Sequence, residues 1–231
     1  MTWAVVPAAG SGVRFGEGVP KQYRMLAGEP LIARTLARLL AHSAIEGAVV
    51  ALAAGDAHWP RLDPRFAKPV IPCVGAADRA GSVLAGLLAL PDCVGDGDIV
   101  LVHDAARPCV RLADLDRLIE AARSGPDGAL LAARVRDTLK RADADGRVGA
   151  TVPREAFWRA LTPQAFARGA LARALEQAAR DGVAVTDEAM AMERLGLRPM
   201  LVEGSEDNIK VTVGSDLAIA ERILAMQEAA A

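Results

Sequence analysis

The sequence has few cysteines, few lysines and no long apolar run. Its 231 residues include three cysteines, Cys73, Cys93 and Cys109, and no two of them form a Cys-x-x-Cys pair. This spacing excludes a disulfide framework and is typical of reduced thiols in a cytoplasmic protein. No apolar run approaches the roughly 18 residues of a membrane span, and the N-terminus lacks the pattern of a secretory signal peptide. We therefore expect cytoplasmic localisation and no membrane partner.

An excess of positive charge is also absent. The chain has 27 lysine and arginine residues against 29 aspartate and glutamate residues, a net charge of −2. A generally basic surface for nucleic acid is therefore not expected, although a local anion site is compatible with this balance. Only four of the basic residues are lysines: Lys21, Lys68, Lys140 and Lys210. In an arginine-rich chain, a lysine indicates a position where a compact ammonium serves better than a planar guanidinium.

What the chain does contain is typical of one folded domain. Hydrophobic residues make up 52% and charged residues 24%, which excludes a disordered chain. A domain of this size buries roughly 70–75% of the surface of its unfolded chain, so its core needs neither disulfide nor metal. No repeat and no Pro/Ser-rich linker divides the sequence, and we expect a single domain over residues 1–231.

Strand-like and helix-like segments alternate through the first 133 residues. Helical spacing predicts helices over 31–40, after the capping residue Asp78, and over 112–123. This alternation favours an α/β, Rossmann-like fold, with a mostly parallel twisted sheet and helices on both of its faces. Apolar runs predict the buried strands of that sheet over 3–8, 47–53, 69–74, 98–103 and 128–133.

The alternation breaks after residue 133. The turn signal Asp143-Ala-Asp-Gly146 separates two strand-like segments and predicts a β-hairpin arm over about 136–152. Such an insertion is expected to protrude and to pair with a second subunit. Further along the chain we expect helices over 167–181 and 186–195, a strand over 198–202 and a last helix from Ser215 to Met226.

Three polar clusters follow predicted strands, where ligands of open parallel sheets bind. The first is the loop from Gly10 to Lys21. Its small residues let backbone N–H groups approach an anion closely, and Arg14 and Lys21 add positive charge. Two cations on a glycine-rich loop favour a polyphosphate ligand.

The glycine spacing of this loop leaves one alternative open. The loop lacks the Gly-x-x-x-x-Gly-Lys-Ser/Thr pattern of a P-loop. Its glycines, Gly10, Gly12 and Gly16, come close to a dinucleotide fingerprint, so an NAD(P)-dependent oxidoreductase remains a competitor. A short-chain reductase is disfavoured, because the only tyrosine, Tyr23, is followed four residues later by alanine and not by lysine.

The second and third clusters add a carboxylate and another lysine. The second reads His-Asp-Ala-Ala-Arg-Pro from His103 onward. Asp104 is placed to hold Mg²⁺ on substrate phosphates, unless it only caps a loop, and Arg107 is placed to bind a second anion. We interpret His103 as a strand-end histidine with satisfied hydrogen bonds. The third cluster, residues 206–212, carries Lys210, which belongs either to a site or to a solvated edge strand.

Other polar residues are scattered, and singly they are typical of turns and caps. Thr186 is a good N-cap for the helix expected over 186–195. Asp187 and Glu188 would complement the dipole of that helix in its first turn.

Taken together, these segments resemble one family, the 2-C-methyl-D-erythritol 4-phosphate cytidylyltransferases, over nearly the whole chain. The opening Ala4-Val-Val-Pro-Ala-Ala-Gly10 is shared more widely among nucleotidyltransferases. More specific are the segments 20–23, 101–108, 136–138, 161–164, 186–189 and 207–212. The resemblance implies a single nucleotidyltransferase domain that transfers CMP from CTP to methylerythritol 4-phosphate and releases pyrophosphate. It also implies a requirement for Mg²⁺ or another divalent cation.

The resemblance implies a role for each matching residue. Arg14, Lys21 and Lys210 would be the catalytic cations around the reacting phosphates, and Asp104 would bind the metal. The hairpin arm would cross to the partner of a homodimer. The nucleotide would be bound by Ala8, Ala9, Gly10, Gly12, Gly75, Ser82, Asp104 and Ala105. The acceptor would be bound by Arg107, Thr138, Arg154, Thr162 and Thr186, with Thr138 and Arg154 serving the neighbouring subunit.

One segment departs from the family pattern. Ala76, Ala77 and Gly81 stand where the family usually has a second glycine and often has polar residues. A side-chain contact from position 77 to cytosine is therefore lost, and backbone groups must recognise the base. Two other functions stay open: a related nucleotidyltransferase with another sugar or polyol phosphate, and a catalytically silent nucleotide-binding protein. The presence of Lys21, Asp104 and Lys210 argues against the silent protein.

Overall fold

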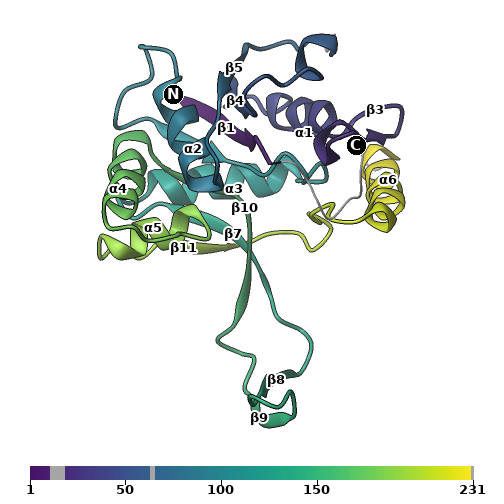
Figure 1. Cartoon of the computed structure of the whole chain (residues 1–231), viewed down its shortest axis with the longest axis vertical. Helices are drawn as coiled ribbons and strands as arrows, with labels where there is room; N and C mark the ends of the chain where they lie inside the picture. The colour runs from purple at the N-terminus through teal and green to yellow at the C-terminus, as the bar shows by residue number, and fades with distance from the viewer. Residues whose placement is uncertain (11–18, 63–65, 230–231) are drawn as a thin grey trace.

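The computed structural model describes residues 1–10, 19–62 and 66–229, which fold around a seven-stranded sheet (Figure 1). Its strands are β1 (Thr2–Ala8), β4 (Gly47–Leu52), β5 (Val70–Val74), β6 (Ile99–Val102), β7 (Ala129–Arg134), β10 (Trp158–Ala167) and β11 (Met200–Glu203). The strand order is β11-β7-β10-β6-β1-β4-β5. All neighbours are parallel except β10, which runs antiparallel to both β6 and β7. The predicted α/β fold with a mostly parallel sheet is confirmed.

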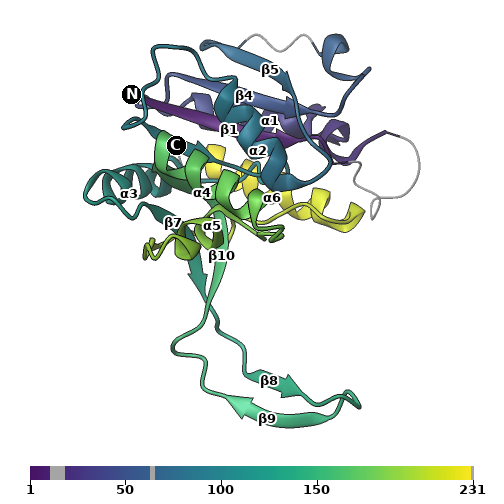
Figure 2. The ribbon, with the colours of Figure 1, turned by 60° about the vertical axis from the view of Figure 1, so that its left-hand side comes forward.

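Helices cover both faces of this sheet (Figure 2). They are α1 (Leu31–Leu40), α2 (Arg79–Leu88), α3 (Leu112–Arg123), α4 (Arg168–Arg180), α5 (Glu188–Arg194) and α6 (Gly214–Ala229). Successive side chains of a strand point to opposite faces. Val6 therefore packs in the core beneath α1 and α3, whereas Val5 packs in the core beneath α2, α4 and α5. All six residues of β4 are buried, as expected for a strand covered on both sides.

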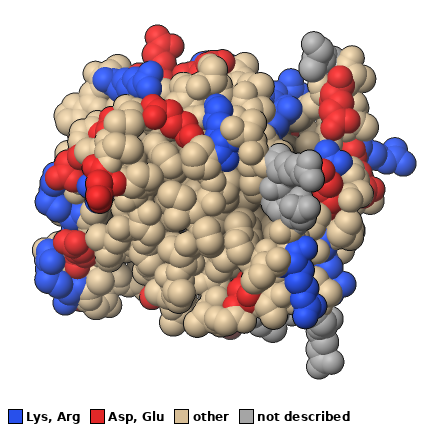
Figure 3. All heavy atoms as spheres, turned by 90° about the horizontal axis from the view of Figure 1, so that it is seen from above, with Lys and Arg blue, Asp and Glu red and all other residues tan. Residues whose placement is uncertain are grey.

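Shorter elements complete the fold. They are β2 (Met25–Leu26), β3 (Glu29–Pro30) and the 3₁₀ turns η2 (Lys21–Tyr23) and η3 (Trp59–Arg61). Helix α6 packs through Ala220 and Leu224 on a third apolar cluster that includes Leu26 and Leu31. No helix in the described part of the chain has the length and apolar character needed to cross a membrane. On the face seen in Figure 3, basic and acidic side chains are interspersed.

A two-stranded arm projects away from the sheet (Figures 1 and 2). It consists of β8 (Leu139–Ala142) and β9 (Val148–Val152), which pair antiparallel. At its turn, Gly146 adopts a φ of 76°, a left-handed conformation that suits glycine. The Asp143 carboxylate accepts hydrogen bonds from the Asp145 and Arg147 amides. The hairpin predicted over 136–152 is therefore present, with shorter strands than the sequence pattern indicated.

Strand β10 is the main element that the sequence analysis missed. It lies between β6 and β7, but its sequence contains Pro163, which has no N–H to donate and is unusual in a central strand. The ladder between β10 and β7 shifts register between Ala160 and Gln164, and the Thr162–Pro163 peptide bond is cis. This irregular stretch accommodates the proline, and it carries Thr162 to the end of β6.

Candidate functional site

A cleft of about 270 Å³ lies beyond the carboxyl ends of β1 and β6. The three polar clusters of the sequence meet here, since Lys21, Asp104 and Lys210 all line it. Its other lining residues are Pro7, Ala8, Gly10, Gln22, Ala76, Ala77, Asp78, Arg79, Ser82, Ala105 and Ala106. The topology explains this convergence, because parallel strands end at the same edge of the sheet. The cleft joins the end of β1, the η2 turn and the start of α2.

The wall formed by β1 and η2 is fixed by a buried glutamine. The Gln22 side-chain amide donates to the carbonyl oxygens of Ala8 and Gly10, over 2.9 and 3.4 Å. Lys21 begins η2 and lines the cleft. Two predicted site residues, Gly12 and Arg14, lie outside the described residues.

The opposite wall is the loop before α2. A Cβ atom on Gly75 would lie 2.9 Å from both the Ala9 Cβ and the Ser82 Oγ, so only glycine allows this close approach. The Ser82 hydroxyl forms hydrogen bonds within the loop: it accepts from the Ala76 amide and donates to the Asp78 carbonyl. Ser82 therefore shapes the loop, whose residues Ala76, Ala77 and Asp78 line the cleft. Asp78 caps α2 as predicted, accepting from the Gly81 amide over 2.7 Å.

Asp104 is the electrostatic centre of the cleft, with 7% of its surface exposed. Its Oδ1 is 3.2 Å from Arg79 Nε, and its Oδ2 is 2.8 Å from Lys210 Nζ and 3.6 Å from Arg107 Nε. Burial alone raises the pKa of this carboxyl, but the charges of Arg79 and Lys210 outweigh burial and hold the pKa well below its usual range. Asp104 is therefore a carboxylate at any physiological pH, and the loop-cap interpretation does not describe its surroundings.

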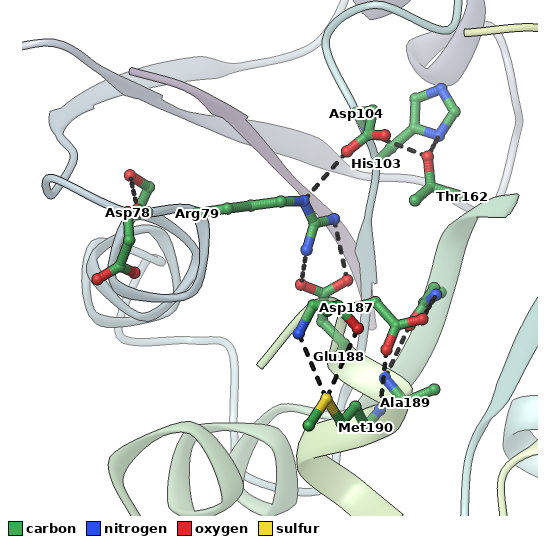
Figure 4. A network of polar contacts seen from close by, with 12 residues as sticks. Asp78, Arg79, His103, Asp104, Thr162, Asp187, Glu188, Ala189 and Met190 are labelled. Carbon is green, nitrogen blue, oxygen red and sulfur yellow. Dashed lines mark hydrogen bonds and ion pairs between the residues drawn. The ribbon is translucent and has the colours of Figure 1, made fainter. Parts of the chain in front are cut away.

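His103 and Thr162 hold the Asp104 backbone in place (Figure 4). Fully buried, His103 lies 2.9 Å from the Arg107 carbonyl through Nε2 and 3.1 Å from the Thr162 hydroxyl through Nδ1. A carbonyl can only accept, so Nε2 carries the proton and Nδ1 accepts from Thr162. The same hydroxyl accepts from the Asp104 amide over 3.0 Å. The environment of His103 agrees with the interpretation of a satisfied strand-end histidine.

This environment predicts a pH-dependent loss of stability. Burial lowers the pKa of His103 to about 4, below the usual value of about 6.5 for an unfolded chain. Between these two pH values His103 is protonated in the unfolded chain and neutral in the folded protein. The free energy of unfolding therefore falls as the pH drops through this window. The loss attributable to His103 is about 3 kcal/mol. Chemical denaturation between pH 8 and 4 measures the fall, and NMR titration of the imidazole checks its origin. A His103 resonance that titrates near pH 6.5 would contradict this assignment.

The residues predicted to bind the acceptor divide into two groups. Arg107 lies beside the cleft: its Nε is 3.6 Å from Asp104 Oδ2, and its guanidinium donates to the Asn208 carbonyl over 2.7 Å. Thr186 is exposed, and its hydroxyl contacts the Met190 sulfur. Thr138 and Arg154 instead line a separate hollow on the arm, so this chain does not bring them to its own cleft. Thr162 is buried, and both of its hydroxyl contacts are made within the protein.

The start of α5 differs from the sequence prediction. The N-cap is Asp187, which accepts from the Met190 amide over 2.9 Å, and not Thr186. A buried glutamine on β10 explains the change, because Gln164 donates to the Asp187 carboxylate and accepts from the Ala189 amide. Glu188 stands in the first turn of α5 as predicted, and its side chain is 1% exposed and paired with Arg79. Neither Arg79 nor Glu188 was predicted as a site residue, since an ion pair between distant segments has no local signal.

A doubly wound α/β sheet with a cation-lined cleft at its carboxyl edge defines a nucleotide-binding protein of the Rossmann-like class. The model of one family, "IspD: 2-C-methyl-D-erythritol 4-phosphate cytidylyltransferase", matches residues 2–226, and the chain belongs to this family. Membership of this family excludes the alternative that the glycine spacing had left open, an NAD(P)-dependent oxidoreductase.

Individual relatives agree over nearly the full chain. A protein of Xanthomonas campestris pv. campestris (strain 8004), named 2-C-methyl-D-erythritol 4-phosphate cytidylyltransferase, is 63% identical over 226 residues, which cover 98% of this chain and 85% of the relative. A crystal structure of a 4-diphosphocytidyl-2C-methyl-D-erythritol synthase superposes with a TM-score of 0.82 at 37% identity, covering 96% of this chain and 97% of the other. The Francisella tularensis IspD structure gives a TM-score of 0.81 at 32% identity, with 96% and 99% covered.

Proposed function

We propose that this protein is a cytidylyltransferase that transfers CMP from CTP to 2-C-methyl-D-erythritol 4-phosphate. An oxygen of the acceptor phosphate bonds to the α-phosphorus of CTP, and the bond from that phosphorus to the pyrophosphate oxygen breaks. The products are pyrophosphate and 4-diphosphocytidyl-2-C-methyl-D-erythritol. The observation that carries the proposal is the meeting of Lys21, Asp104 and Lys210 in one cleft of a chain from this family.

The chemistry of this transfer fits the residues of the cleft. A phosphate monoester is already an anion at neutral pH, so it needs no general base to become a nucleophile. The catalyst must instead shield like charges, align the two phosphates and stabilise the charge of the transition state. Lys21 and Lys210 supply the positive charge, and Arg14 is proposed to join them. The nucleotide is proposed to contact Ala8, Ala9, Gly10, Gly12, Gly75, Ser82, Asp104 and Ala105.

A divalent cation also fits the cleft, although the protein alone provides few ligands for one. In the described residues, no group of three His, Cys, Asp or Glu side chains could hold a metal. Mg²⁺ in phosphoryl-transfer sites is commonly bound by one or two carboxylates together with substrate phosphates, and Asp104 is the cleft carboxylate suited to that role. The cation would neutralise phosphate charge. Asp104 would have to exchange part of its contact with Arg79 or Lys210 for the metal.

The arm is proposed to complete the acceptor site of a second subunit in a homodimer. An isolated two-stranded hairpin is only marginally stable in water, yet this one projects from the sheet (Figure 1). Val148 on this hairpin is 66% exposed, and Phe157, which directly precedes β10, is 46% exposed. A partner subunit would bury these surfaces, and Thr138 and Arg154 would lie at its acceptor site. Arg107 and Thr186 are proposed to bind the same acceptor from its own subunit, with Thr162 holding the Asp104 loop beside it.

Pyrophosphate release tests the proposed reaction directly. The protein is incubated with CTP, Mg²⁺ and methylerythritol 4-phosphate, and each component is omitted in turn. We expect release only when all three are present, with formation of the diphosphocytidyl product. Release with a different sugar or polyol phosphate, and none with methylerythritol 4-phosphate, would move the assignment to a related nucleotidyltransferase. CTP binding without turnover of any acceptor would indicate a silent nucleotide-binding protein.

A further inference from the structure

Arg79 lies in the cleft between two carboxylates that come from different parts of the fold. It is the first residue of α2, and its Nε is 3.2 Å from Asp104 Oδ1. Its two other nitrogens form a forked pair with Glu188, Nη1 to Oε1 over 2.5 Å and Nη2 to Oε2 over 3.1 Å (Figure 4). A guanidinium is planar, so a bidentate contact on one edge fixes the direction of the remaining Nε–H.

Glu188 is an unusual residue to bury. It is 1% exposed at the start of α5, and a carboxylate removed from water costs free energy unless it is paired and hydrogen bonded. Both of its oxygens accept from Arg79. An apolar pair could fill the same volume at less cost, so packing alone does not account for this pair. The Nε of Arg79 is directed at Asp104, which indicates a role for the pair in the cleft.

The pair divides the oxygens of Asp104 between two cations. With Arg79 held by Glu188, only Nε reaches Oδ1, while Lys210 Nζ occupies Oδ2 at 2.8 Å. If Glu188 lost its charge, the Arg79 guanidinium would be drawn to Asp104 as its remaining carboxylate partner. It would then compete with Lys210 and with any ligand that approaches Asp104 from the cleft.

We propose that Glu188 is a positioning residue for the nucleotide side of the site, and that it acts through Arg79. Through this pair, α5 holds the guanidinium beside Asp104 and keeps Asp104 available to the ribose or metal-bound phosphates of the nucleotide. The inference rests on the proposed function for its substrate, CTP. The Arg79–Glu188 pair thereby connects the segment that carries Thr186 to the nucleotide cleft.

The test compares steady-state kinetics and CTP binding by calorimetry for Glu188→Gln, Arg79→Met and the double variant. Glu188→Gln frees Arg79 to close on Asp104, and Arg79→Met removes the cation that fixes Oδ1 of Asp104. We therefore expect each single change to raise the KM and Kd for CTP about tenfold. Adding Glu188→Gln to the Arg79→Met background should change neither value further. Glu193→Gln makes the same chemical change at an exposed position of α5 and should behave as wild type.

Several outcomes would overturn the inference. If Glu188 only supports the local structure of α5, the KM for the acceptor rises through Thr186 while the KM and Kd for CTP stay unchanged. Additive effects of the two substitutions would show that Glu188 does not act through Arg79. If Glu188→Gln fails to fold, the apolar pair Arg79→Met with Glu188→Met removes both charges, and a wild-type CTP affinity in that variant contradicts the proposal. Absence of turnover in the wild type would count against the proposed function, while CTP calorimetry would still test the pair.

Discussion

Replacing Lys21 with alanine is expected to lower kcat by about 10²-fold or more, because a charge contact made in the transition state is lost. Lys21 stands at the start of η2 and lines the same cleft as Asp104 and Lys210. The reacting phosphates gather negative charge as the new bond forms, and a fixed ammonium stabilises that charge without reorganisation. Pyrophosphate release at saturating CTP and acceptor measures the effect.

Two further substitutions sharpen this experiment. Lys21→Arg keeps the charge but replaces a compact ammonium by a planar fork, so we expect only partial activity. Arg173→Ala removes one positive charge from an exposed position of α4 and should leave kcat unchanged. A near-normal kcat in Lys21→Ala would remove Lys21 from the mechanism. A loss confined to the KM for CTP would make it a ground-state binding residue.

Reversing the charge of Arg154 is expected to impair use of the acceptor through the neighbouring subunit. Arg154 lies on the arm together with Thr138, and both line a hollow that is separate from the cleft of their own chain. Arg154→Glu would place a carboxylate against the acceptor phosphate and should raise the KM for methylerythritol phosphate at least tenfold. Thr138→Arg should act on the same substrate. Loss of CTP affinity with unchanged acceptor affinity would show that this side of the site is wrongly assigned.

Mixing these two impaired variants, assayed below the acceptor KM of Arg154→Glu, tests the crossing of the arm. In a heterodimer of Lys21→Ala with Arg154→Glu, one of the two sites combines an intact cleft with an intact partner arm. With random pairing at equal concentrations, about one quarter of all active sites are intact, and we expect about one quarter of the wild-type activity. Refolding or co-expression of the two chains, followed by the pyrophosphate assay, measures the recovery. Each variant alone supplies the control, and no recovery in verified heterodimers would mean that Arg154 serves its own subunit.

The regular part of the fold could be predicted because its signals are local. Strands buried on both faces appear as short apolar runs, and β1, β4, β6 and β7 agree with their predicted ranges to within one or two residues. Strand β10 could not be predicted in the same way, because Pro163 disfavours a central strand and the register shift that accommodates it depends on pairing with β7. The antiparallel insertion of β10 between β6 and β7 therefore followed only from the tertiary structure.

The sequence by itself determined the chemical character of the site. Rare lysines, a glycine-rich loop and an aspartate after a strand predicted an anion-binding edge, and the motifs identified the family. Only the tertiary structure decided how the charges are shared. Arg79 and Glu188 are 109 residues apart, and neither lies in a pattern that refers to the other. Their pairing and the depressed pKa of Asp104 depend on which charges the fold brings within a few ångströms of a buried carboxylate, which no local pattern specifies.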